Sequence, residues 1–212
     1  MPDIQVIALF MAAAIALNLT PGPDMLFCLA NGMHRGPRAG VAAALGVAAG
    51  ALVHTLGAAF GLAGLLLASP LLFEAVRWAG AAYLAWLAWK TVTAPPSPVR
   101  DPGVPACGAD LRRIFLRGAV TNILNPKVAL FFLAFLPQFI QPEAGPVAAQ
   151  AVLLGCLMNT SGTLVNAAVG VGAGGLGRVL ARNPVVGRVL NWLTGIVFLG
   201  LAVRLGLASR NG

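Results

Sequence analysis

The segment that decides the fold is Ile4–Asn31, which reads IQVIALFMAAAIALNLTPGPDMLFCLAN. As one helix, its 28 residues would be about 42 Å long at about 1.5 Å per residue, which exceeds the hydrocarbon thickness of a bilayer. Pro21, Gly22 and Pro23 remove backbone donors and interrupt the helix. The carbonyl groups freed by this break need partners, so the sequence predicts a broken transmembrane helix whose break faces protein or a water-filled cavity.

The composition of the whole chain is that of a membrane protein. Of its 212 residues, 58% are hydrophobic and only 9% are charged, whereas a soluble domain carries about 25% charged residues. Since backbone groups cannot stay unpaired in lipid and a helix needs about 20 apolar residues to span it, we expect an all-α polytopic membrane protein with six transmembrane helices. The six apolar stretches are Ile4–Asn31, Gly40–Ala68, Leu71–Val92, Ala119–Ile140, Val147–Gly172 and Val189–Leu207.

Charge and cysteine content exclude several other classes of protein. The net charge of +8 comes from basic residues placed between apolar runs, whereas a nucleic-acid-binding protein gathers them on one water-soluble face. Cys28, Cys107 and Cys156 form neither a CxxC pair nor a cluster with histidine, so neither a metal site nor a disulfide framework is predicted. The N-terminus lacks the basic region of a signal peptide, so we expect the first span to be retained.

A proline-rich polar stretch divides the chain into two halves. Residues 93–118 are expected to form a cytoplasmic linker, whose second part could be a short interfacial helix. Residues 1–92 and 119–212 then hold three spans each, and an odd number inverts the second half relative to the first, as in many secondary transporters. Ten of the 14 Lys and Arg residues lie in loops on the linker side, so the positive-inside rule predicts that both termini lie outside the cell inner membrane.

The second half contains a counterpart of the first break, in Asn122-Ile-Leu-Asn125-Pro126-Lys127. Interrupted helices in both halves favour a transporter binding site, although prolines also kink membrane helices that have no such site. The first motif lies late in its expected span and the second lies early, so we do not expect a strictly symmetric pair. The candidate substrate-binding residues come from the two breaks and from one polar position of the fifth span. They are Asn18, Thr20, Pro21, Gly22, Pro23, Asp24, Asn122, Asn125, Pro126, Lys127 and Asn159.

Asp24 and Lys127 are the acid and the lysine that lie well inside apolar runs. Each costs about 2.5–3.5 kcal/mol at the bilayer centre on insertion scales, which makes a functional role the default expectation. They could pair with each other, or bind the ammonium and carboxylate groups of a zwitterion between them, and the two ideas are compatible. A carboxyl group in a low dielectric can exchange a proton near neutral pH, so Asp24 is a candidate proton-coupling residue. His54 is the second, although a single helical histidine is about as often a hydrogen-bonded core residue.

Small residues recur inside the spans. Gly46 and Gly50 form a GxxxG pair, and Gly57 and Gly61 form another. Small residues let helix backbones approach closely in lipid, so we interpret both pairs as packing surfaces rather than as sites of chemistry. The glycine-lined faces also make a homodimer plausible.

Motifs typical of enzymes do not occur in the sequence. It contains no HExxH, no P-loop, no paired catalytic carboxylates and no Ser/His/Asp arrangement. We therefore expect neither an enzyme nor a cofactor, and no ATP-driven transport encoded in this chain.

Taken together, the motifs resemble the lysine exporter (LysE/RhtB) family of translocators. The resemblance is carried by Asn18–Asp24, Arg35–Gly46, Asn122–Phe132 and Leu136–Phe139, and it extends over nearly the whole chain in length, order and span count. It implies efflux of amino acids or closely related small metabolites by proton antiport across a bacterial-type inner membrane. The matching residues belong to the family's shared framework, so they do not indicate which substrate is carried. The alternative is a membrane channel or scaffold without coupled transport.

Overall fold

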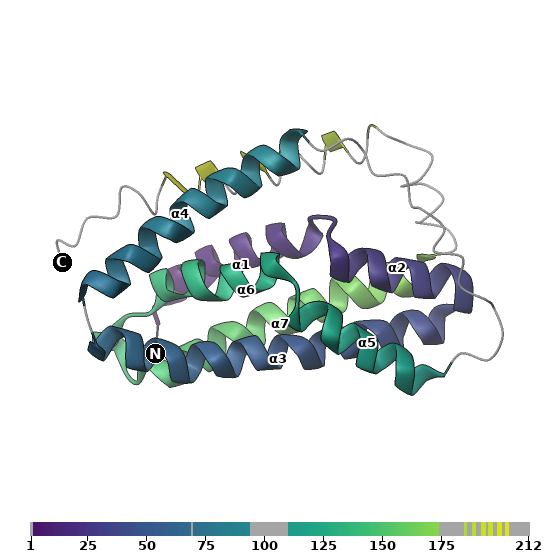
Figure 1. The fold of residues 1–212 in the computed structure, drawn as a ribbon, viewed down its shortest axis with the longest axis horizontal. Helices are drawn as coiled ribbons and strands as arrows, with labels where there is room; N and C mark the ends of the chain where they lie inside the picture. Colours follow the sequence, from purple (N-terminus) through teal and green to yellow (C-terminus); the bar gives the residue numbers. More distant parts are fainter. Residues whose placement is uncertain are drawn as a thin grey trace.

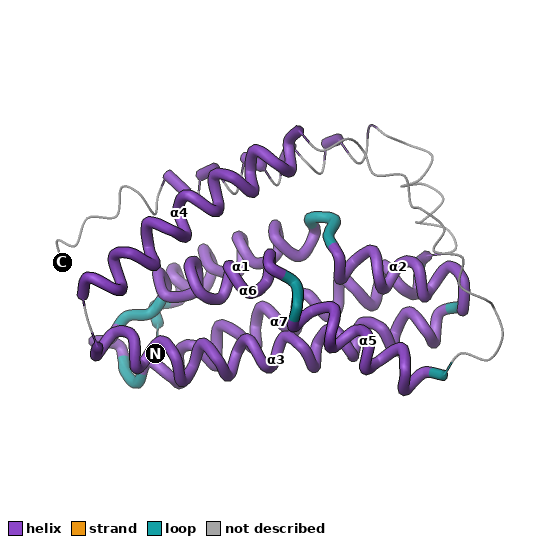
Figure 2. Tube along the Cα trace, in the orientation of Figure 1, coloured by secondary structure: helices purple, strands orange, loops and turns teal. Residues whose placement is uncertain are grey.

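The computed structural model describes residues 2–68, 70–93 and 110–173, together with separate residues between Val185 and Val203. Within these ranges the regular structure is helical and no strand occurs, which confirms the all-α prediction. The helices lie along one long axis and form an elongated bundle (Figures 1 and 2).

The first broken span consists of α1 (Ile4–Leu19) and α2 (Pro23–Arg35). α1 begins after Asp3, whose side chain accepts a hydrogen bond from the backbone N–H of Gln5. α2 begins at a proline, whose fixed φ suits the first turn of a helix. The two helices meet at 51° across the Thr20–Gly22 break, where the sequence predicts it.

The remaining helices of the first half are α3 (Pro37–Ala68) and α4 (Pro70–Thr93). Gly36 joins α2 to α3 with a φ of 85°, a conformation that glycine adopts without steric cost. α3 therefore reverses direction directly after α2 and runs beside it. α4 lies along the edge of the bundle, tilted relative to the helices beneath it (Figure 1).

The second broken span begins with α5 (Leu111–Ile123) and continues as α6 (Pro126–Leu130). The chain then becomes π-helical in η1 (Phe131–Phe135) and 3₁₀-helical in η2 (Leu136–Phe139). The two parts meet at 46°. The short 3₁₀ turn η3 (Pro142–Ala144) leads into α7 (Val147–Val171).

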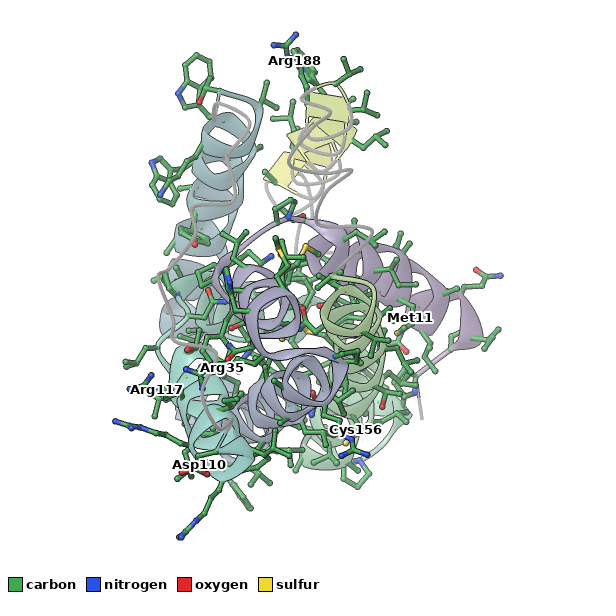
Figure 3. The ribbon with its side chains drawn as sticks, turned by 90° about the vertical axis from the view of Figure 1, so that its right-hand side faces the viewer. Met11, Arg35, Asp110, Arg117, Cys156 and Arg188 are labelled. Carbon is green, nitrogen blue, oxygen red and sulfur yellow. The ribbon has the colours of Figure 1, made fainter. Side chains whose placement is uncertain are left out.

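The position of the second break corrects one expectation from the sequence. α5 begins at Leu111, inside the segment expected to be linker, and its 13 residues precede the break. The break therefore lies near the middle of its helix pair, as does the first break, which 16 residues precede and 13 follow. Arg112, Arg113 and Arg117 lie in this helix, ahead of the apolar run at Ala119 from which the span was expected to begin; all three are exposed, and Figure 3 shows Arg117 on the outer edge of the bundle.

By length and composition, α7 and residues Pro37–Gly61 of α3 can each cross a membrane. Counting each bent pair as one span raises the number to four within the described part of the chain. The sixth expected span, Val189–Leu207, lies largely outside the described residues.

Glycines bring the central helices into backbone contact. A Cβ atom at Gly32 or Gly40 would collide with the backbone of Gly170 in α7, and one at Gly46 or Gly50 would collide with the backbone of α5. The packing role expected of the Gly46/Gly50 pair is therefore confirmed. The second pair differs, because a Cβ at Gly57 or Gly61 would meet nothing within 4 Å among the described residues.

The largest core cluster is rich in phenylalanine and joins α1 to the irregular part of the second broken span. Phe10 packs with its ring centroid 5.9 Å from that of Phe131, 6.3 Å from Phe135 and 5.3 Å from Phe139. These four side chains are at most 3% exposed. Phe131, Phe135 and Phe139 are spaced four residues apart, so their rings face one cluster, which places a buried aromatic core directly beyond the second break.

Candidate functional site

The two helix breaks face each other, and Asp24 lies at their meeting point. Its Oδ2 atom accepts a hydrogen bond from Asn122 Nδ2 at 2.9 Å and another from Asn125 Nδ2 at 2.8 Å. All three side chains are buried. Residues about 100 positions apart thus form one polar cluster inside an apolar bundle.

Local helix structure explains why these three side chains converge. Asp24 lies in the first turn of α2, where the unpaired N–H groups of a helix favour a negative charge. Asn125 caps the start of α6 by accepting a hydrogen bond from the N–H of Lys127 at 3.0 Å, and its amide nitrogen remains free to bind Asp24. Asn122 lies in the last turn of α5. Each break therefore supplies a helix end, and the cluster joins the two.

Lys127 crosses in the opposite direction and binds the end of α1. Its Nζ donates to the carbonyl oxygen of Leu17 at 2.9 Å and to that of Thr20 at 3.1 Å. The last carbonyls of a helix have no partner within the helix and carry partial negative charge, so an ammonium group stabilises them. Gly22 makes room for this side chain, since a Cβ there would lie 3.3 Å from Nζ.

The two charged side chains do not form an ion pair in this arrangement. Asp24 is bound by amide groups and Lys127 by carbonyl groups. The buried acid and the half-buried lysine therefore make their hydrogen bonds to the opposite break rather than to each other.

His54 of α3 lies next to this cluster. Its Nε2 is 3.1 Å from the carbonyl oxygen of Asn122, and its ring stacks on Phe132 with the centroids 5.8 Å apart. The second candidate for proton coupling thus contacts the break itself and one edge of the aromatic core.

Two further candidate residues fix α7 against its neighbours. Asn18 donates to Ser161 Oγ at 3.0 Å and to the carbonyl oxygen of Met158 at 3.3 Å, which ties the end of α1 to α7. Asn159 instead donates to the carbonyl oxygen of Ala48 at 3.1 Å and ties α7 to α3. The structure therefore brings Asn18 beside the first break and directs the amide of Asn159 to a helix–helix contact.

The remaining candidates shape the backbone. Pro23 and Pro126 each occupy the first position of a helix, where the missing N–H costs nothing. Pro21 is exposed. Thr20 donates from Oγ1 to the carbonyl oxygen of Ala16 at 2.8 Å, and its own carbonyl receives Lys127.

Two buried oxygens of the cluster have no hydrogen-bond partner among the described residues. They are Asp24 Oδ1 and Asn122 Oδ1. Buried polar atoms are almost always paired, so these two indicate that the site has unused capacity to accept hydrogen bonds or positive charge.

Sequence reasoning proposed most of the side chains that meet in this cluster but did not indicate their backbone partners. The carbonyl groups of Leu17 and Thr20, which bind Lys127, carry no signal in residue type. Gly50, which was expected only to pack helices, also makes room for Asn122 because it lacks a side chain. Among the described residues, no group of three or more His, Cys, Asp or Glu side chains is placed to hold a metal ion.

Comparison with known proteins decides the family. The sequence model of the family described as LysE type translocator matches residues 15–209. This chain belongs to that family. The translocator is 31% identical over 197 residues to the leucine efflux protein of Enterobacter sp. (strain 638), with 92% of each chain covered. It is 30% identical over 196 residues to the leucine efflux protein of Klebsiella pneumoniae, again with 92% of each chain covered.

A third relative matches over almost its entire length. This uncharacterized membrane protein of Vibrio cholerae is 31% identical to the translocator over 210 residues, which are 98% of this chain and 99% of the relative. No solved structure matches the translocator. Family membership confirms the resemblance noted from the motifs, and it confirms that the chain is a multi-pass membrane transporter rather than an enzyme.

Proposed function

We propose that this translocator exports amino acids or closely related small metabolites by proton antiport, using the cluster around Asp24. The observation that carries the proposal is the meeting of two broken helices at one buried acid, with a lysine of the second break beside it. Broken helices place partial charges at a transport site without exposing backbone to lipid. The leucine efflux proteins among the relatives support an amino acid as the substrate.

The chemistry of an amino acid fits the groups that the cluster offers. An ammonium group donates hydrogen bonds, and Asp24 Oδ1 and Asn122 Oδ1 are buried acceptors without a donor. A carboxylate needs a cation, and Lys127 is held by neutral carbonyls that a carboxylate can replace. In this proposal, both ionic groups of the substrate are recognised within the two breaks.

The apolar part of the substrate would lie against the adjoining core. Leu17 and Val128 flank the lysine site and are at most 6% exposed, and both belong to the phenylalanine-rich cluster. An aliphatic side chain packed there leaves water, which favours branched apolar substrates such as leucine over charged ones.

The finer topology belongs to the same proposal. We infer that the chain crosses the cell inner membrane six times, as two inverted halves joined by a cytoplasmic linker, with both termini outside. The similar mid-pair positions of the two breaks support the inverted repeat. A homodimer stays a prediction, and cross-linking in native membranes tests it.

Efflux from proteoliposomes tests the function. Vesicles are loaded with a mixture of labelled amino acids that includes leucine, and efflux is followed with and without an imposed pH gradient, acidic outside. We expect gradient-dependent loss of one compound or a few related compounds. Asp24→Asn should abolish this component while the folded protein remains in the membrane.

If no compound leaves faster than from protein-free vesicles, despite confirmed insertion, amino-acid export is refuted and a channel or scaffold becomes the better explanation. Efflux that is fast but indifferent to the pH gradient would retain the export and refute the antiport.

A further inference from the structure

One hydrogen bond joins two side chains that each carry a buried atom without a partner. Asn122 Nδ2 donates to Asp24 Oδ2 at 2.9 Å, while the other polar atom of each side chain, Asp24 Oδ1 and Asn122 Oδ1, has no partner in the described part of the chain. The two side chains are 9% and 2% exposed, so water does not readily supply the missing partners. Burial of two unpaired acceptors is unfavourable, and it occurs here on both ends of the same hydrogen bond.

Rotation of the amide group does not relieve the problem. A carboxylate only accepts hydrogen bonds, so the amide nitrogen must face Asp24 Oδ2, as it does. Turning Asn122 over would direct its oxygen at an atom that is negatively charged and already receives Asn125. The orientation of Asn122 is therefore fixed by Asp24, and its oxygen is left without a donor.

A single proton placed between the two oxygens would satisfy both. A proton on Asp24 Oδ1 turns this oxygen from an acceptor into a donor, and Asn122 Oδ1 is an acceptor that lacks a donor. The N–H···O bond already present and the new O–H···O bond then run in opposite directions between the same two groups and close a ring of two hydrogen bonds.

From this geometry we infer that the cluster holds a proton between Asp24 Oδ1 and Asn122 Oδ1, with Asn122 as the positioning residue that retains it. The inference rests on the proposed proton antiport and deepens it, because it names the partner that shares the transported proton. Loss of the proton to water leaves the two oxygens unpaired again, and the site is then ready for an ammonium group.

The other residues around Asp24 do not take the place of Asn122 as partner of this proton. The titratable groups that interact electrostatically with Asp24 come from three elements, namely Cys28 of α2, His54 of α3 and Lys127 of α6. Lys127 donates to the carbonyls of α1, and His54 meets the backbone of Asn122. Asn125 binds the same carboxyl group, but its own oxygen already accepts from the N–H of Lys127. Asn125 therefore orients Asp24, and its oxygen, unlike that of Asn122, already has a donor.

The variant Asp24→Asn separates this inference from a purely structural role. Its amide group has a nitrogen where Asp24 has Oδ1, so it donates to Asn122 Oδ1 at any pH, and its oxygen still accepts from both asparagines. A folded state that holds a proton which the unfolded state releases loses stability as the pH rises. The melting temperature of the wild-type protein in detergent should therefore fall as the pH is raised from acidic to alkaline, and that of Asp24→Asn should stay level and exceed it at alkaline pH.

Asp110→Asn is the matched control, because Asp110 is exposed and caps α5 far from the cluster. Its melting profile should follow the wild-type profile in shape. Parallel profiles for wild type and Asp24→Asn, or a lower melting temperature for Asp24→Asn at every pH, would overturn the inference. Recovery of the wild-type melting temperature at alkaline pH by sodium chloride, but not by choline chloride, would also overturn it, since an alkali cation would then fill the position.

A second measurement does not depend on the stability of a variant. The infrared spectrum of the wild-type protein at neutral pH should contain the C=O band of a protonated carboxyl group. The spectrum of Asp24→Asn should lack this band, and that of the double exchange Asp24→Asn/Asn122→Asp should retain it at a shifted position. Absence of the band from the wild type refutes the inference. Neither measurement uses a substrate, so a proton site without amino-acid efflux refutes the proposed function alone, and efflux without the band refutes this inference alone.

Discussion

Replacing Gly50 with alanine tests whether close packing of α3 on α5 positions the polar cluster. A Cβ atom there would lie 2.5 Å from the carbonyl oxygen of Ala119 and 2.8 Å from the Cβ of Asn122. Real Cβ contacts essentially never fall below 3.0 Å, so the two helices must move apart. Gly57→Ala is the matched control, because it is the same substitution on the same helix at a position with nothing within 4 Å.

The expected difference in the free energy of unfolding follows from two opposing effects. Alanine is favoured over glycine inside a helix by about 0.8–1.0 kcal/mol, and both variants gain this. Overpacking costs about 1–3 kcal/mol, and only Gly50→Ala incurs it. The free energies of unfolding of the two variants should therefore differ by about 1–3 kcal/mol, which corresponds to about 2–12 °C in melting temperature for a chain of this size.

Thermal unfolding in dilute detergent, where association between chains is weakest, measures this difference. Efflux gives an independent measurement, because displacement of Asn122 weakens its hold on Asp24. We expect Gly50→Ala to lose efflux at equal membrane levels and Gly57→Ala to keep it. Equal melting temperatures and equal efflux for the two variants would refute the argument that backbone contact between α3 and α5 sets the geometry of the site.

Two further substitutions test separate contacts. Lys127→Gln removes the ammonium group that binds the end of α1. A hydrogen bond from a charged group contributes about 1.5–3 kcal/mol, so efflux at equal protein levels should fall at least about tenfold. Unchanged efflux would contradict a role for this lysine. Gln150→Leu breaks three hydrogen bonds that a 1% exposed amide makes with the backbone of Gln141 and Gly145. It should destabilise the protein by about 1–3 kcal/mol in thermal unfolding while efflux per folded molecule is unchanged, and a selective loss of efflux would show that this loop belongs to the transport path.

The sequence predicts the breaks well, because proline and glycine act through the backbone wherever they occur. Pro21 to Pro23 end one helix and begin another irrespective of what surrounds them. The charged residues are equally informative, since Asp24 and Lys127 cannot lie in lipid without partners. Most candidate residues of the site follow from these two considerations.

The partners of these residues could not be predicted in the same way. A helix surrounded by lipid and by other apolar helices carries no clear polar face, so the sequence does not indicate which side of α7 meets α3 or α1. The amide of Asn159 binds the backbone of α3 and that of Asn18 binds α7, which only the packed bundle determines. The rings of the π-helical turn at Phe131–Phe135 likewise pack against Phe10, a distant partner that the local sequence does not indicate.

The crossed hydrogen bonds between the two breaks have a consequence for leakage. Asp24 of the first half binds amides of the second, while Lys127 of the second binds carbonyls of the first. Neither half can loosen its own break without releasing a group that belongs to the other, so partly opened forms lose bonds on both sides at once. Such mutual dependence makes intermediate forms rare, and under the proposed antiport a carrier that spends little time in them would dissipate little of its driving gradient.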